Sequence, residues 1–297
     1  MYDIVSLGEL LIDFTQSGIS PAGMRLFEQN AGGAVTNLLC AAASCGAKTA
    51  FIGKVGADMH GAFLKRTMEQ AGVDMQALIE SPDVFTTLAF VSLKPNGERE
   101  FSFARKPGAD TQLRPDELNR DLLEHTCIFH TGSLSLTQEP SRSATYEAID
   151  IARRAGAIIS YDPNYRASLW SSEDEAIHFM RSLIATADIM KVSEEELPLL
   201  TGEANPAAAA DLLLDHGVKL VAITLGEKGA FIRVGGESRL VPGFRSDPVD
   251  TTGAGDAFFG GFLCRFLNSG VTLKDVTLEN AADYARWHES QHAHALQ

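Results

Sequence analysis

A short glycine-rich segment ends in a carboxylate and runs directly into an apolar helical pattern. The segment is Asp250-Thr251-Thr252-Gly253-Ala254-Gly255-Asp256, and Ala-Phe-Phe-Gly-Gly-Phe follows it. Successive N–H groups of a glycine loop form a concavity that binds anions, and a helix N-terminus adds its positive dipole end. A carboxylate beside such a site suits a general base that takes the proton from a hydroxyl attacking a phosphoryl group.

The segment therefore predicts phosphoryl transfer to a hydroxyl. Asp256 is the expected base, and the backbone at Gly253, Ala254 and Gly255 is the expected anion hole. For an isolated Gly-x-Gly-Asp motif a simpler interpretation stays open, in which Asp256 only stabilises the N-terminus of its own helix. The full seven-residue string is far more specific than that motif.

The rest of the chain alternates between strand and helix patterns, which would position this segment. Apolar strand patterns at 4–7, 127–131, 189–192 and 220–224 are separated by helical patterns such as 139–155. This alternation predicts a mostly parallel, doubly wound sheet with helices on both faces, which is a three-layer α/β/α fold. We expect one domain over residues 1–297.

One stretch interrupts the alternation. Strand patterns at 85–93 and 98–103 flank Lys94-Pro95-Asn96-Gly97, which is a strong hairpin turn signal. A hairpin cannot enter a parallel sheet without its own crossover, so we expect it to project as a lid, with segments at about 15–30 and 85–105. An ordinary edge hairpin is the alternative. Phe101 and Phe103 share one face of a strand, which suits either an apolar cover over a substrate or hairpin packing.

Composition excludes several classes of protein. The chain has 297 residues, 25 Lys and Arg against 39 Asp and Glu, and a net charge of −14 without a basic cluster. Nucleic-acid and membrane partners are therefore not expected. The four cysteines form no Cys-x-x-Cys pair, which favours a reduced, cytoplasmic protein. Neither a P-loop nor a dinucleotide-binding glycine motif follows the first strand pattern.

The segment 250–256 resembles the C-terminal signature of the ribokinase-like (PfkB) carbohydrate kinase family. Other segments resemble the same family, in its fructokinase branch, and in the same order: 8–14, 32–37, 51–61, 101–110, 162–166 and 224–229. The resemblance implies a ribokinase-like fold with a small β-sheet lid. It also implies ATP-dependent phosphorylation of a sugar hydroxyl, most simply fructose to fructose 6-phosphate, with Mg²⁺ and K⁺ as cofactors.

The resemblance also assigns roles to single positions. It implies sugar contacts from Asp13, Gly33, Asn37, Phe101, Phe103, Arg105 and Asn164. It implies a nucleotide site bordered by Thr224, Gly226, Gly229, Gly253 and Gly255. It implies a Mg²⁺ contact through water at Glu196, and a monovalent cation at Asp250 and Thr252. A homodimer formed through the lid is a further expectation.

The sequence departs from the family pattern at two places. Ser193 stands where the family has asparagine, so residues 193–196 also fit a helix capping box. The tail 286–297 matches nothing in the family, which affects the expected adenine and cation subsites. A 2-keto-3-deoxygluconate kinase, or another sugar or nucleoside kinase, is the alternative within the family. A catalytically impaired sugar-binding regulatory protein is the alternative from another class.

Overall fold

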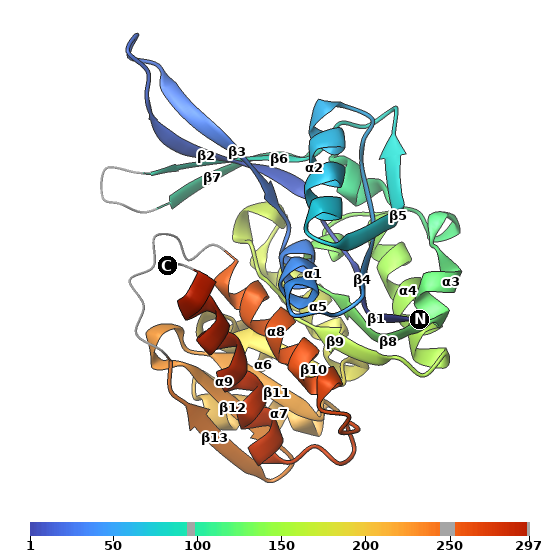
Figure 1. Cartoon of the computed structure of the whole chain (residues 1–297), viewed down its shortest axis with the longest axis vertical. Helices are drawn as coiled ribbons and strands as arrows, with labels where there is room; N and C mark the ends of the chain where they lie inside the picture. The colour runs from blue at the N-terminus through green and yellow to red at the C-terminus, as the bar shows by residue number, and fades with distance from the viewer. Residues whose placement is uncertain (94–98, 244–252, 296–297) are drawn as a thin grey trace.

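The computed structural model describes residues 1–93, 99–243 and 253–295, without the side chains of 93, 99–101 and 287–295. Its main body is a nine-stranded sheet in the order β13-β12-β11-β10-β9-β8-β1-β4-β5 (Figure 1). The strand bounds are β1 Tyr2–Leu7, β4 Thr49–Gly56, β5 Val73–Ser81, β8 Thr126–Thr131, β9 Ile158–Tyr161, β10 Ile189–Ser193, β11 Leu220–Thr224, β12 Ala230–Val234 and β13 Glu237–Val241.

The sheet is parallel from β5 to β11, and β12 and β13 continue it as an antiparallel edge. Its inner strands are almost continuously buried, as expected for a parallel sheet whose two faces are both covered by helices. The carboxyl ends of its strands consequently meet along one edge, where open α/β sheets bind their ligands.

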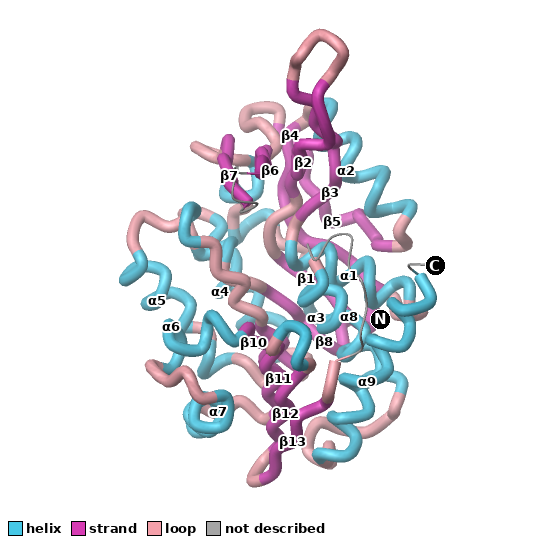
Figure 2. Tube along the Cα trace, turned by 90° about the vertical axis from the view of Figure 1, so that its left-hand side faces the viewer, coloured by secondary structure: helices cyan, strands magenta, loops and turns pink. Residues whose placement is uncertain are grey.

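Helices cover both faces, and Figure 2 shows α8 and α9 on one side of the strands and α5 to α7 on the other. One buried apolar cluster joins the sheet to α3 through α7, and a second joins it to α1, α2, α8 and α9. The helix bounds are α1 Ala34–Ser44, α2 Met59–Gln70, α3 Arg120–Glu124, α4 Ser141–Arg154, α5 Glu173–Ser182, α6 Leu197–Thr201, α7 Pro206–Asp215, α8 Ala254–Asn268 and α9 Leu278–Ala295. The predicted three-layer fold is confirmed.

None of the helices in the described ranges has both the length and the apolar character needed to cross a bilayer. The last of them, α9, covers most of the tail that departs from the family pattern.

A second, four-stranded sheet in the order β3-β2-β6-β7 projects from the main body (Figure 1). Its strands are β2 Leu11–Ile19, β3 Arg25–Gly32, β6 Leu88–Leu93 and β7 Arg99–Ala104. The predicted hairpin is therefore β6 and β7, and it lies in this separate sheet, so the alternative of an edge hairpin on the main sheet is wrong. The predicted turn, residues 94–97, lies outside the described residues. We call this second sheet the lid sheet.

Candidate active site

The N-terminus of α8 carries the predicted base. Gly253 is the N-cap residue with φ 74°, a left-handed conformation that glycine adopts without strain. Asp256 lies in the first turn and is 7 % exposed. The first N–H groups of a helix have no partner within it, so the backbone after Gly253 offers donors to an anion. The predicted cation ligands Asp250 and Thr252 lie outside the described residues.

Each oxygen of the Asp256 carboxylate accepts one amide hydrogen bond. Asn37 Nδ2 donates to Oδ2 over 3.0 Å, and Asn164 Nδ2 donates to Oδ1 over 2.9 Å. The two amides therefore fix the orientation of the carboxylate. The structure thus brings together three predicted site residues that are far apart in the sequence.

The approach of α1 to α8 positions the first of these donors. A Cβ atom on Gly260 would lie 2.4 Å from the backbone oxygen of Leu38, which is far inside contact distance. Only glycine lets the two helices come this close. Because Asn37 precedes Leu38 on α1, and Asp256 lies one turn before Gly260 on α8, the close crossing brings their side chains into hydrogen-bonding distance.

Asn164 has φ 50°, and it is the one non-glycine residue with positive φ in the part of the chain described. Such a conformation costs on the order of 1–3 kcal/mol and persists where surrounding contacts determine it. Asn164 Nδ2 also donates to Asp162 Oδ2 over 3.2 Å, and the next amide, that of Tyr165, donates to Glu196 Oε1 over 2.7 Å. The strained segment is therefore fixed on both sides.

Asp162, which accepts from Asn164, also forms a buried ion pair. Lys191 Nζ is 2.8 Å from Asp162 Oδ2, and the two residues are 5 % and 2 % exposed. We did not predict a role for either residue. One signal was present, because Lys191 is a single charge within the apolar strand pattern Ile-Met-Lys-Val, and lysine is almost never fully buried unless it is paired.

Asp13 lies on the face of the lid sheet that carries the predicted sugar cover. It pairs with Ala89, which pairs in turn with Phe103, and directly paired residues point to the same face. Phe103 is partly buried, whereas Phe101 pairs with Val91 and its side chain lies outside the description. The Asp13 side chain has no hydrogen-bond partner among the described residues. Burial raises the pKa of Asp13 to about 6, against the lowering effect of Arg166.

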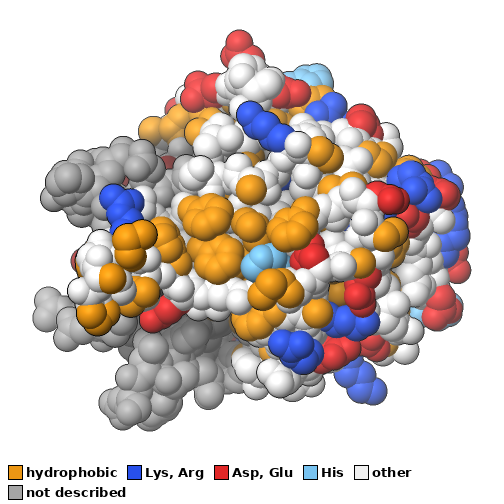
Figure 3. All heavy atoms as spheres, turned by 90° about the horizontal axis from the view of Figure 1, so that it is seen from above, with side chains coloured by type: hydrophobic (Ala, Val, Ile, Leu, Met, Phe, Trp, Pro, Cys, Tyr) orange, Lys and Arg blue, Asp and Glu red, His pale blue; other side chains and the backbone are white. Residues whose placement is uncertain are grey.

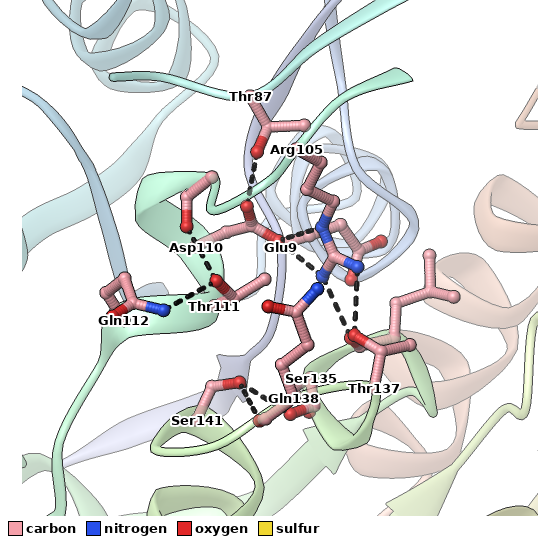
Figure 4. Close-up of polar contacts among 12 residues, drawn as sticks. Glu9, Thr87, Arg105, Asp110, Thr111, Gln112, Ser135, Thr137, Gln138 and Ser141 are labelled. Atoms are coloured by element: carbon pink, nitrogen blue, oxygen red, sulfur yellow. Dashed lines mark hydrogen bonds and ion pairs between the residues drawn. The ribbon is translucent and has the colours of Figure 1, made fainter. Parts of the chain in front are cut away.

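Arg105 lies at the base of the lid sheet, and Figure 4 shows its guanidinium among polar groups from several elements. It donates through Nε and Nη2 to Asp110 Oδ2 over 2.8 and 2.6 Å. It also donates to Thr137 Oγ1 and to the backbone oxygen of Leu134. The Arg105 side chain is 3 % exposed. Four of its five N–H donors are thus used within the protein.

Gly33 is the N-cap of α1, with φ 130°. A Cβ atom there would lie 2.4 Å from the backbone oxygen of Glu9, so a larger residue would push the two segments apart. Glu9 Oε1 accepts from the Ala34 amide over 2.7 Å. Burial raises the pKa of Glu9 to about 7, although that amide lowers it. Glu9 lies within the segment 8–14 that resembles the family, and no role was predicted for it.

The predicted nucleotide and metal residues follow β10 and β11. Thr224 ends β11 and pairs with Ser193 at the end of β10. Gly226 and Gly229 form the next turn with φ 57° and 100°. The predicted capping box is confirmed, because Glu196 Oε2 accepts from the backbone and hydroxyl of Ser193, each over 2.9 Å. Within the described residues, no three acidic, His or Cys side chains are grouped so as to hold a metal ion.

Comparisons with known proteins show the family of this chain. The model of the pfkB family carbohydrate kinases matches residues 1–287. A probable fructokinase-4 from Arabidopsis thaliana is 44 % identical over 92 % of this chain and 84 % of its own length. The fructokinase of Vibrio cholerae O395 with fructose, ADP and calcium is 33 % identical, with a TM-score of 0.87 over 97 % of this chain and 91 % of that one. A double mutant of that enzyme with fructose, ADP and potassium is 32 % identical, with a TM-score of 0.85 over 97 % and 90 %. This chain therefore belongs to the pfkB family of carbohydrate kinases.

Proposed function

We propose that this chain phosphorylates fructose to fructose 6-phosphate with ATP, and that Asp256 is the general base. The observation that carries the proposal is the Asp256 carboxylate, which two amides hold at the N-terminus of α8. The sugar hydroxyl oxygen forms a bond to the γ-phosphorus while the bond to the ADP oxygen breaks. Asp256 takes the hydroxyl proton, and backbone N–H groups after Gly253 stabilise the charge on the transferred group.

Polar groups around Asp256 would bind the sugar. Asp13 faces the site from the lid sheet without a hydrogen-bond partner in the described residues, so its carboxylate is available to sugar hydroxyls. Asn37 and Asn164 have further capacity through their amide oxygens, and the Gly33 backbone lies at the start of the same helix as Asn37. Arg105 has one N–H left for the sugar or its phosphate, so we assign it mainly to holding the base of the lid sheet.

The apolar side of the sugar site would come from β7. The registers put Phe103 on the same face as Asp13, and the backbone of Phe101 two residues earlier follows the same alternation. A cover over the reacting groups excludes water, which would otherwise accept the phosphoryl group. The lid sheet thereby serves the specificity of the reaction as well as sugar binding.

ATP would lie over the carboxyl ends of β10 and β11, bordered by Thr224, Gly226 and Gly229, with its phosphates at Gly253 and Gly255. A divalent ion such as Mg²⁺ would neutralise phosphate charge there. Glu196 fits such an ion only through water, because three hydrogen bonds already occupy its carboxylate and about four acceptor positions exist in all. We further propose K⁺ at Asp250 and Thr252, since a similar fructokinase contains potassium.

A second copy of the chain would cover the outer face of the lid sheet. The rings of Phe14 and Phe90 stack there with centroids 5.2 Å apart, and Phe27 and His60 contact this pair. Figure 3, viewed from above, shows hydrophobic side chains gathered beside a histidine on this surface. Exposed apolar patches of this kind mark interaction sites, so we propose a homodimer through the lid.

We also propose a cytoplasmic location. It is supported by the four cysteines, which are all free thiols, as proteins of reducing compartments have. Fractionation of the source cells would test the location, and recovery in a secreted fraction would contradict it.

A coupled assay of ADP release over a panel of sugars tests the proposed function. Fructose should give the highest kcat/KM, and the product should carry phosphate on the 6-hydroxyl. A higher kcat/KM with 2-keto-3-deoxygluconate, or with another sugar or nucleoside, would replace fructose as the substrate. Fructose binding without sugar-dependent ADP release would instead show a regulatory protein.

A further inference from the structure

The buried ion pair of Lys191 and Asp162 is incompletely satisfied. An ammonium group has three N–H donors, yet the one partner of Lys191 Nζ in the described residues is Asp162 Oδ2. The other oxygen, Asp162 Oδ1, is buried and has no hydrogen-bond partner there. A buried polar network with missing hydrogen bonds costs folding free energy. A purely structural role for the pair would therefore not explain why these donors and this acceptor are left unpaired.

The unused donors of Lys191 lie at the anion hole. A Cβ atom on Gly255 would be 3.0 Å from Lys191 Nζ and 3.3 Å from Cε. The ammonium therefore lies against the backbone of the glycine loop, whose N–H groups we assign to the transferred phosphoryl group. Because Gly255 has no side chain, nothing from this residue separates Nζ from an anion in the loop.

The charges around Lys191 keep it protonated. Burial lowers its pKa, but the carboxylates of Asp162, Glu196 and Asp256 raise it, so the net pKa lies above the ordinary value. These three carboxylates would by themselves repel the phosphate groups of ATP. One fixed cation among them offsets that repulsion where the phosphoryl group must approach Asp256.

We propose that Lys191 is a catalytic residue whose ammonium donates a hydrogen bond to an oxygen of the γ-phosphoryl group, and that Asp162 positions it. This inference rests on the proposed kinase function. Lys191 forms no covalent bond and keeps its proton throughout, so its contribution is electrostatic and grows as the phosphoryl oxygens gain charge in the transition state.

The test compares Lys191→Met with Lys54→Met, which removes an equally buried lysine elsewhere. Lys54 is 6 % exposed and pairs with Glu117 over 2.7 Å. Lys54→Met should lower the melting temperature and leave kcat unchanged. Lys191→Met should lower kcat by roughly 10²–10³-fold, the effect of removing one donor to a developing anion. Lys191→Arg should restore part of that loss.

A binding measurement separates a phosphoryl contact from a structural role. Calorimetry with ADP and with the β,γ-imido analogue of ATP gives a ratio of two Kd values for each protein. In Lys191→Met, affinity for the analogue should fall about tenfold more than affinity for ADP, the loss of a charge-assisted hydrogen bond. An equal fall for both ligands would overturn the inference. If Lys191→Met does not fold, the double variant Asp162→Asn/Lys191→Met leaves no unpaired buried charge and should show the same selective loss.

The kinase function and this inference fail in different ways. If the wild-type protein releases no ADP with any sugar, the proposed function fails before any variant is considered. If the wild-type protein turns over fructose and Lys191→Met retains the wild-type kcat, the role of Lys191 alone is wrong.

Discussion

Asp256 combines two properties that a base for phosphoryl transfer needs. It is buried, and each of its two oxygens accepts a hydrogen bond from an amide that fixes it in place. One donor comes from the helix α1 and the other from the strained loop after β9. The orientation of the carboxylate therefore depends on a helix layer and on the sheet. A free carboxylate at the same position would lose this orientation, which is part of the rate advantage of a positioned group.

Asp13 should give sugar binding a characteristic pH dependence. Burial raises its pKa to about 6, and in the proposed sugar site its ionised form would accept hydrogen bonds from sugar hydroxyls. As pH falls through 6 the carboxylate is protonated, so KM for fructose should rise, by about tenfold at pH 5. Initial rates between pH 5 and 8 give this profile. Asp13→Asn should bind fructose more weakly at pH 8 and lack the rise, and an unchanged profile in that variant would assign the titration to another group.

At this scale the sequence predicts residues that belong to a contiguous motif. Asp256 and its glycines are adjacent in the sequence, and Asn37 and Asn164 each lie in a segment that resembles the family. These residues could therefore be predicted as site residues from the sequence. Asp162 and Lys191 become a pair only when β9 and β10 lie side by side. Similarly, Arg105 was predicted at the site, but its partner Asp110 and the buried backbone oxygen of Leu134 depend on tertiary contacts.

The lid sheet is an element with two chemically different faces. Its strand registers place Asp13 and Phe103 on the inner face, and Phe14 and Phe90 on the outer face. Alternation along a strand lets one segment present two different surfaces. We therefore expect mutations on the inner face to affect the proposed sugar site, and mutations on the outer face to affect the proposed dimer.

Phe103→Ser should open the inner face. With less apolar cover, KM for fructose should rise several-fold, and ATP hydrolysis without sugar phosphorylation should increase because water reaches the site. Measuring ADP and sugar phosphate separately gives the uncoupled fraction. Phe90→Ser, on the outer face of the neighbouring strand, is the matched control and should leave KM and coupling unchanged. Equal behaviour of the two variants would contradict the assignment of the faces.

The hydrophobic pattern of a segment predicted those helices and strands that have a clear periodicity of their own. The strand predicted over 220–224 agrees with β11 to the residue, and the helical pattern over 139–155 agrees with α4 to within two residues at each end. The edge strands β5 and β13, and β12 beside β13, have no counterpart among the predicted strands, and all three are partly exposed. The parallel pairing of β2 with β6 was also not predicted, since it joins segments separated by β3, α1, β4, α2 and β5.

At the scale of the whole molecule, the lid sheet projects away from the main body and presents apolar groups to solvent. Ile19, Met24 and Leu26 are 59 %, 67 % and 46 % exposed, and Phe27 and Phe90 are 38 % and 39 % exposed. A net charge of −14 opposes association of two copies, so in the proposed dimer the apolar face would supply the attraction. Phe27 and Phe90 both lie on the outer face, so two lid sheets packed by their outer faces would bury these two rings.

Phe90→Glu should shift the protein from dimer to monomer, because a buried carboxylate in an apolar interface costs several kcal/mol. Sedimentation velocity at micromolar concentration measures the molar mass of each protein. Lys65→Glu, a charge change on the surface of α2, is the control and should leave the dimer intact. A monomeric wild-type protein would contradict the lid dimer.

The turnover of Asp256→Asn tests the central claim most directly. This variant removes the proton acceptor while keeping the size of the side chain, although an amide can accept from only one of the two asparagines that donate to Asp256. We predict a folded protein that binds fructose with a Kd within a few-fold of wild type, and a kcat lower by about 10²–10⁴-fold. Stopped assays with fructose and saturating ATP measure the rate, and calorimetry measures the Kd. A folded Asp256→Asn protein with the wild-type kcat would show that Asp256 is not the base.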